Sequence, residues 1–409
     1  MLKGSFKHVV ATAVAWAIGF ALLGGAAQAV ELVIWSFRGQ EIPEPVLRAF
    51  EAANPGVVVN QIFPSGDLRG ENFLVASAAG VPPDLIHLNE DFLPMYVENN
   101  LVVPITRRVE AGEFGPLDAY FPGVIRRYQG EIYFVPHRQS VNTLLYNRVM
   151  FSEAGLNADE PPATWDEFRT AARRLTTTDD GRTQWLGAVV ATSATTMTSW
   201  FQPMLWQSGG DIFIDGRVSI NNDAGREALS FFVDAVSEGY AGTSTSLFTQ
   251  GRAGMRWPGH PGAVIQFRRD QGLDFVDVGP VLANKQPAGY GSLAGWVVPR
   301  GPNAELAIKL LAFTLQPEHV TAFLAATAFL PVRRDIALDY FGREHVEWAQ
   351  KFVAQQPYVR FDILHPEARA LQGIIAQTLM TAVTGNVPVE TALEEAERLA
   401  NAHLAERRY

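Results

Sequence analysis

Short apolar runs alternate with amphipathic segments in the part of the chain that follows position 29. The pattern predicts strands at Glu31–Ser36, Val57–Phe63 and Leu85–Leu88, separated by helices over Glu44–Ala53 and about 70–79. This β-α-β-α-β order is typical of a mostly parallel sheet with helices packed on it.

The middle of the chain continues the alternation. Thr164 and Glu167 have the spacing of a capping box, so they predict the start of a helix over Trp165–Leu175. The dipeptide Asp215-Gly216 indicates a hairpin. A helix over Ala224–Ser237 carries one apolar stripe. Further strands are predicted at Leu186–Val190, Val218–Ile220, Ala253–Trp257, Phe275–Gly279 and Gly295–Pro299.

From Asn303 onward the periodicity predicts almost only helix. The predicted segments are Ala304–Leu315, Glu318–Ala328, Glu344–Gln355, Glu367–Thr384 and Val389–Arg407. The pattern therefore indicates the α/β fold class, with two α/β units and a helical C-terminal segment.

The first 29 residues have the layout of a cleaved secretory signal peptide. Lys3 and Lys7 precede an apolar run over 9–23, and Ala27-Gln28-Ala29 forms a small-residue cleavage site. A permanent membrane anchor is the alternative, but it needs about 20 apolar residues. We therefore expect cleavage near Ala29 and a periplasmic or secreted product.

Composition narrows the classes of function. The chain has 409 residues and a formal charge of −10, which becomes −12 when Lys3 and Lys7 leave with the leader. An acidic chain without basic clusters is a poor nucleic-acid binder. The absence of Cys excludes disulfides, thiol catalysis and Cys-ligated metals. A mature chain of this length favours two lobes over a single core.

No motif indicates catalysis, a cofactor or a metal. The sequence lacks His-Glu-x-x-His, Gly-x-Ser-x-Gly and a phosphate-binding loop, and its eight His residues have no metal-ligand spacing on one predicted helix. The segment 289–294 fits a relaxed dinucleotide pattern, but a strand rather than a helix is predicted after it. A glycosidase needs only two facing carboxylates, so the secreted carbohydrate-active enzyme stays open as an alternative.

Aromatic residues recur where predicted strands and helices end. They are Trp35, Phe37, Trp200, Trp206, Trp257, Tyr290 and Trp296, of which the last two bracket a Gly-rich turn. Ligands of open α/β sheets bind beyond the carboxyl ends of the strands, and flat aromatic faces beside polar groups suit a sugar. Each Trp is equally compatible with an ordinary core position, which we assign to Trp165, Trp185 and Trp348.

Several segments together resemble the extracellular solute-binding proteins of ABC importers, in the large family that includes the maltose- and multiple-sugar-binding proteins. The matching stretches are 32–37, 50–56, 82–89, 130–136, 145–147, 162–168, 205–211, 330–334 and 392–396. Their order and spacing cover nearly the whole mature chain.

The resemblance implies a two-lobed periplasmic-binding-protein fold of type II, in which each lobe is a mostly parallel sheet flanked by helices. By analogy lobe 1 comprises 30–139 and 279–330, and lobe 2 comprises 140–278 and 331–409. It implies hinge closure on a mono- to oligosaccharide, delivery to permease subunits at the membrane, a monomer, no cofactor and no enzymatic activity.

The resemblance also carries over candidate ligand-binding residues. They are Trp35, Arg38, Asn89, Glu90, Asp91, Arg138, Gln139, Trp206, Asp211, Trp257, His260, Tyr290, Gly291, Ser292, Trp296 and Arg333. We expect Trp257 or Trp35 to be the stacking platform. Asp91, Glu90, Arg138 and Arg333 are then expected to hold hydroxyl groups.

One departure from the family pattern leaves the ligand open. Phe37-Arg38-Gly39-Gln40-Glu41 stands where many members have a Gly-rich or acidic stretch. Arg38 and Arg138 suit bidentate binding of a carboxylate or phosphate, so an anionic sugar derivative or a glycerol phosphate is the alternative ligand. Pairing of each Arg with a neighbouring acid is the other interpretation. A receptor domain that signals is a further alternative, although no fused kinase is encoded.

Overall fold

The computed structural model describes residues 29–36, 41–63, 71–180, 182–327, 330–337 and 347–407. Residues 1–28 of the predicted signal peptide and Arg38 lie outside these residues. Among the helices that the structure describes, none is both long and apolar enough to cross a bilayer.

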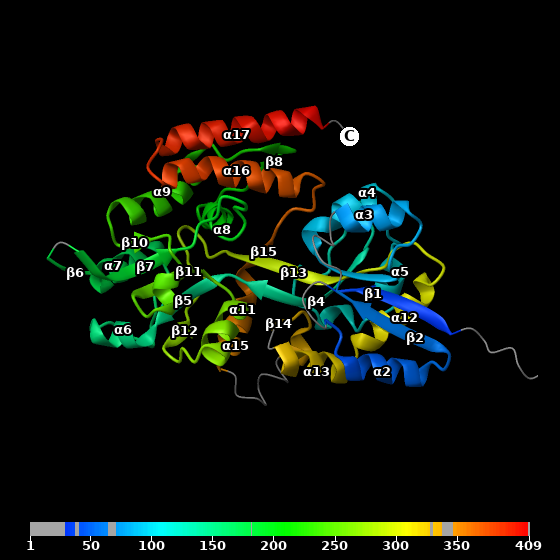
Figure 1. Cartoon of the computed structure of the whole chain (residues 1–409). Helices are drawn as coiled ribbons and strands as arrows, with labels where there is room; N and C mark the ends of the chain where they lie inside the picture. Colours follow the sequence, from blue (N-terminus) through cyan, green and yellow to red (C-terminus); the bar gives the residue numbers. More distant parts are fainter. Residues whose placement is uncertain are drawn as a thin grey trace, which may run out of the picture.

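The first lobe is built on a mixed sheet of seven strands (Figure 1). The order is β14-β4-β13-β3-β1-β2, and β15 pairs with β13. The strands are β1 Val30–Trp35, β2 Val57–Ile62, β3 Leu85–Asn89, β4 Phe134–Val141, β13 Gly289–Val297, β14 Leu330–Pro331 and β15 Val359–Phe361. Its helices are α2 Glu44–Ala53, α3 Glu71–Ala78, η1 Glu90–Phe92, α4 Leu93–Glu98, α5 Thr106–Glu110, α12 Ala304–Thr314 and α13 Pro317–Thr327, with a short turn η2 Leu117–Ala119.

The second lobe contains a six-stranded sheet in the order β10-β7-β11-β5-β12, with β6 paired to β7. Its strands are β5 Thr143–Asn147, β6 Thr177–Asp179, β7 Arg182–Val190, β10 Ala241–Gly242, β11 Ala253–Gly259 and β12 Val276–Val278, beside the hairpin of β8 Phe213–Ile214 and β9 Arg217–Val218. Its helical segments are α6 Arg148–Glu153, α7 Trp165–Leu175, α8 Phe201–Gln207, α9 Asp223–Ser237, α10 Ser246–Thr249, α11 Pro261–Val264, η3 Ile265–Asp270, α15 Glu347–Ala354, η4 Gln356–Tyr358, α16 Ala368–Val383 and α17 Val389–Glu406.

The chain passes between the lobes along β-strands. β4 of the first sheet leads into β5 of the second with only Asn142 between them, and β12 leads back to β13 through residues 279–288. These crossover strands explain why both sheets are mixed. β1 runs parallel to β2 and β3, whereas β13 is antiparallel to β3 and β4, and β5 is antiparallel to β11 and β12.

The C-terminal helices cover the second lobe, as predicted. Leu371, Ile375 and Leu379 of α16 share one buried core with Leu229 and Phe232 of α9. Figure 1 shows α16 and α17 stacked above α9, on the side of the second lobe away from α6. The two-lobed α/β class with a helical C-terminal segment is therefore confirmed.

The predicted Gly-rich turn before Gly295 is wrong. Residues 289–297 form the single strand β13, and Gly289 to Gly291 pair with β15. A Cβ at Gly291 would lie 2.4 Å from Cγ1 of Val359. Glycine here allows two strands to approach closely, so it marks packing rather than a turn.

Candidate functional site

A polar cavity of about 340 Å³ lies between the two lobes. A volume of this size falls within the range of small-molecule sites. The first lobe contributes Asn89, Glu90, Asp91, Tyr290, Ser292 and Leu293. The second lobe contributes Thr195, Thr196, Thr198, Asp362, Arg369 and Gln372.

Three carboxylic acids give the cavity its electrostatic character. Glu90 is 5% exposed and its Oε2 accepts a hydrogen bond of 2.7 Å from Arg126. Burial, with the nearby Asp362 and Asp91 carboxylates adding to it, raises the pKa of Glu90 to about 7 despite that Arg126 contact. Burial also raises the pKa of Asp362, although Gln202 donates to this carboxylate over 3.2 Å.

An aromatic pair extends from the cavity wall into the second lobe. The rings of Tyr290 and Trp206 are stacked, with centroids 6.4 Å apart and planes at 21°. The Arg360 guanidinium lies 4.7 Å from the Trp206 ring centroid. Asp211 accepts from both, over 3.1 Å from Trp206 Nε1 and 2.7 Å from Arg360. These contacts hold the Tyr290 ring in one orientation at the cavity.

One ion pair joins the lobes at the cavity. Arg369 of α16 donates to Asp91 of the first lobe over 2.7 Å, and its guanidinium lies 4.2 Å from the Phe92 ring centroid. Among the described residues that line the cavity, Arg369 is the one cation and it is already paired, so this part of the lining has an excess of acid.

The threonines of the lining come from a segment that the sequence reasoning missed. The segment 191–199 follows β7 directly, and Thr196 and Thr198 share a hydrogen bond of 2.8 Å. Six of the eight residues from Thr192 to Ser199 carry a hydroxyl group, and they follow the carboxyl end of a predicted strand. This pattern could have identified the segment as a part of the site.

The structure brings seven of the predicted ligand-binding residues to this region. Asn89, Glu90, Asp91, Tyr290 and Ser292 line the cavity, and Trp206 and Asp211 lie behind Tyr290. Their role as ligand contacts stays a prediction.

Other predicted residues lie elsewhere. Trp257 and Trp296 are 0% and 1% exposed, in the cores of the second and first lobes respectively. Arg333 is buried, where it donates to Asp335 over 2.8 Å and to the Leu315 carbonyl over 3.3 Å. His260 is exposed, and its Nδ1 accepts from the Ala263 amide at the start of α11. These placements do not support Trp257 as a stacking platform or Arg333 as a hydroxyl-binding group.

The remaining described residues of the prediction contact protein groups. Trp35 is half-buried against the first-lobe core, and Gln139 donates to the Pro331 carbonyl over 2.9 Å. Gly291 packs against β15. Arg138 lies 3.4 Å from a Glu41 carboxylate oxygen, which supports the interpretation that this Arg pairs with a neighbouring acid.

Glu41 also lies beside two buried histidines of the first sheet. Burial raises the pKa of Glu41, but His137, His87 and Arg138 together lower it to about 2. Burial lowers the pKa of His137. The group is therefore a carboxylate beside an imidazole that favours its neutral form.

Comparison with known proteins agrees with this architecture. A protein of Brucella abortus (strain 2308) described as a binding protein is 25% identical over 380 residues, which are 88% of this chain and 89% of that protein. The sugar-binding protein MalE from Xanthomonas citri has a TM-score of 0.82 at 20% identity and covers 93% of this chain and 98% of its own. The cyclic alpha-maltosyl-1,6-maltose binding protein from Arthrobacter globiformis has a TM-score of 0.81 at 21% identity, with coverages of 92% and 99%.

A family model of bacterial extracellular solute-binding proteins matches residues 46–352. That match spans well over half of the sequence, and the two-lobed fold with a polar interlobe cavity is consistent with it. The chain belongs to the bacterial extracellular solute-binding protein family.

Proposed function

We propose that this protein binds a neutral mono- to oligosaccharide in the interlobe cavity and delivers it to the permease of an ABC importer. The observation that carries the proposal is the chemistry of the cavity lining. Three acids, three threonines, a serine, a tyrosine and two amides line it. Such side chains satisfy both the donor and the acceptor capacity of sugar hydroxyls.

The same lining argues against the anionic alternative. A phosphate or a uronic acid would enter beside Glu90, Asp91 and Asp362. The one cation among the described lining residues, Arg369, is already paired with Asp91. A negative charge on the ligand would be repelled by each of these acids that is ionised. Arg138 is directed to Glu41 rather than to the cavity lining, which removes one of the two arginines on which that alternative depended.

The proposal includes capture by closure. A sugar held by groups of both lobes stabilises the closed arrangement, because those contacts exist together only when the lobes meet. We further propose that the mature protein begins after Ala29, acts outside the inner membrane as a monomer, and releases its ligand unchanged.

The test is a thermal-shift and calorimetry screen of the mature chain against neutral saccharides, uronic acids and glycerol 3-phosphate. A ligand at about 100 times its dissociation constant adds about 2.7 kcal/mol of stability. We expect a shift with at least one neutral saccharide. A shift confined to anionic ligands would overturn the neutral-sugar proposal, and a new saccharide product after incubation would overturn binding without conversion.

A matched pair of variants locates the binding. Thr196→Val removes one cavity hydroxyl, and Thr321→Val removes a hydroxyl that is exposed on α13 and bonded to the Pro317 carbonyl. Loss of one hydrogen bond costs about 0.5–1.5 kcal/mol, or roughly 2- to 12-fold in affinity. Equal affinities for the two variants would place the ligand outside this cavity.

A further inference from the structure

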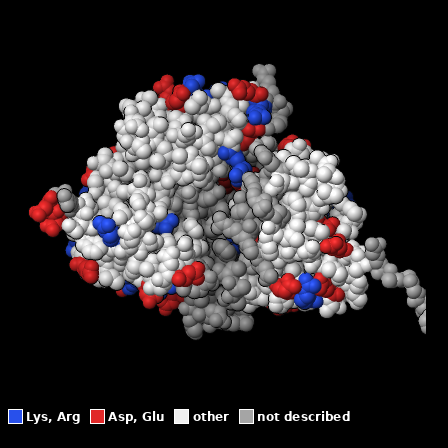
Figure 2. Space-filling model, in the orientation of Figure 1, with Lys and Arg blue, Asp and Glu red and all other residues white. Residues whose placement is uncertain are grey.

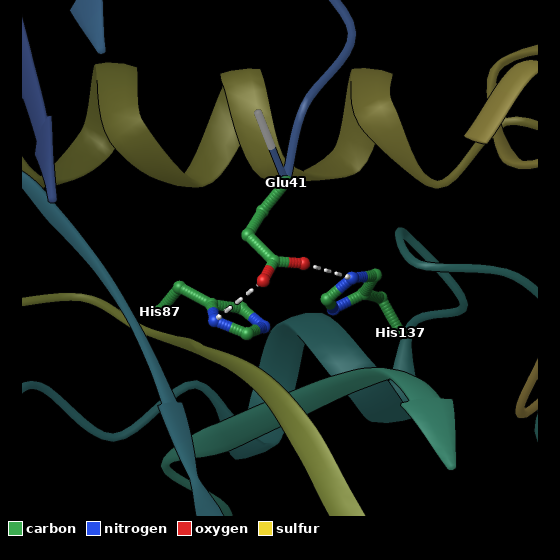
Figure 3. Close-up of side chains that lie close together, drawn as sticks. All are labelled: Glu41, His87 and His137. Carbon is green, nitrogen blue, oxygen red and sulfur yellow. Dashed lines mark ion pairs between the residues drawn. The ribbon is translucent and has the colours of Figure 1, made fainter. Parts of the chain in front are cut away.

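Glu41, His87 and His137 converge in the interior of the first lobe (Figure 3). His87 comes from β3, His137 from β4 and Glu41 from the segment that precedes α2. Their side chains are 4%, 0% and 7% exposed for Glu41, His87 and His137 respectively. One ligand atom from each lies within 4.8 Å of the other two.

The distances within this cluster are longer than those of direct bonds. His87 Nδ1 lies 3.6 Å from one Glu41 oxygen, and His137 Nε2 lies 3.5 Å from the other. Charge-assisted hydrogen bonds are about 2.7–2.9 Å long. Two ligands bound at about 2.0–2.1 Å to one tetrahedral or trigonal ion stand about 3.3–3.6 Å apart. The two imidazoles face different oxygens of the Glu41 carboxylate, at a spacing that is compatible with one cation shared by the three side chains.

His137 provides an independent observation. Its polar neighbours among the described residues are Glu41, 3.5 Å away, and the Ala294 backbone, and neither makes a hydrogen bond of good geometry to its buried ring nitrogens. Buried polar atoms in folded proteins are almost always satisfied by protein, water or an ion. A cavity of about 20 Å³ adjoins His137 and Glu41, and that volume admits one water-sized species.

We propose that Glu41, His87 and His137 bind one divalent transition-metal ion, with Zn²⁺ as the ion best suited to the donors. Two imidazoles and a carboxylate are ligands of zinc sites with three protein ligands, and the fourth position is taken by water. The site is separate from the interlobe cavity and does not depend on the proposed function. It would tie the segment before α2 to β3 and β4, the strand that crosses to the second lobe.

The residues around the cluster determine how tightly we expect the metal ion to bind. The Arg138 guanidinium, 3.4 Å from Glu41, orients the carboxylate but repels a divalent ion. The Trp296 ring lies 4.9 Å from His87 and 6.0 Å from His137 between centroids, so the site is shielded from solvent. We therefore expect micromolar affinity, weaker than that of structural zinc sites.

The experiment titrates Zn²⁺ alone into untagged, chelator-treated mature protein by calorimetry, with Co²⁺ absorption as a second readout. We expect one Zn²⁺ per chain and the visible spectrum of a low-coordinate Co²⁺ ion. His137→Gln and His87→Gln should each weaken binding at least tenfold. His260→Gln changes an exposed histidine outside the cluster and should leave binding unchanged.

Two results would overturn the proposal. One is the absence of stoichiometric binding to the wild-type chain. The other is affinity that stays within twofold in both cluster variants. Circular dichroism checks that the variants fold, and Glu41→Gln replaces any variant that does not. Native mass spectrometry of the wild-type protein with one equivalent of Zn²⁺ decides the question even if every variant unfolds.

Discussion

Replacing Glu90 by Gln should change how stability depends on pH. Glu90 is almost fully buried, and burial together with Asp362 and Asp91 raises its pKa from the usual 4.5 to about 7, with Arg126 opposing the rise. Between these two pH values the folded chain holds a proton that the unfolded chain has lost. The free energy of unfolding therefore falls as the pH increases through this window.

The magnitude follows from the two pKa values. A difference of about 2.5, at 1.36 kcal/mol for each unit, amounts to about 3 kcal/mol. The Glu90→Gln variant lacks this titration. We expect it to match the wild type near pH 5 and to exceed its stability by up to about 3 kcal/mol near pH 8.

Urea denaturation of both proteins at pH 5 and pH 8 measures this difference. Asp362 and Asp91 are present in both chains, so their contributions to the stability difference largely cancel. Glu160→Gln, an exposed loop substitution, is the control and should show no such pH-dependent gain. A gain in unfolding free energy of Glu90→Gln that is the same at both pH values would refute the reasoning, because it would mean that burial does not raise the pKa of Glu90.

Three other substitutions test the assignment of site and core. Arg369→Met removes the partly exposed ion pair between Arg369 and Asp91, which joins the lobes. Its loss should favour the open arrangement of the ligand-free protein by about 1 kcal/mol. Solution scattering should then show a larger radius of gyration. Trp257→Phe should lower the free energy of unfolding by about 1–3 kcal/mol in urea denaturation and leave sugar affinity within twofold. A tenfold loss of affinity would mean that Trp257 contacts the ligand. Gly291→Ala should cost about 1–3 kcal/mol by the same assay, because its Cβ would overlap Val359, and an unchanged midpoint would contradict the close β13–β15 packing.

Surface charge agrees with the composition. On the face shown in Figure 2, basic and acidic side chains are scattered or mixed in small groups. An acidic chain with this distribution is poorly suited to bind a polyanion.

Local patterns by themselves determined much of the secondary structure. The predicted helices at Glu44–Ala53 and Trp165–Leu175 are present with these bounds, and the capping box of Thr164 and Glu167 is formed. The hairpin at Asp215-Gly216 is present, with φ of 52° and 76° at the two turn residues. Such features depend on residues a few positions apart, so the sequence contains all the information that they need.

Family resemblance and strand order located the first-lobe wall of the cavity, from Asn89 to Asp91 and at Tyr290 and Ser292. Burial was less predictable. An aromatic residue at the end of a strand can face a ligand or a core, and only the packing of helices over each sheet placed Trp257 and Trp296 inside.

Only the tertiary structure decided which distant polar groups meet. Asp362, Arg369 and the segment 191–199 reach the first-lobe wall because β4 and β13 carry the chain across, so that the two lobes lie side by side. Glu41, His87 and His137 share no local spacing, since one stands in a loop and the others on strands separated by β13. Periodicity describes the faces of single elements, whereas such sites form where faces of several elements are packed together.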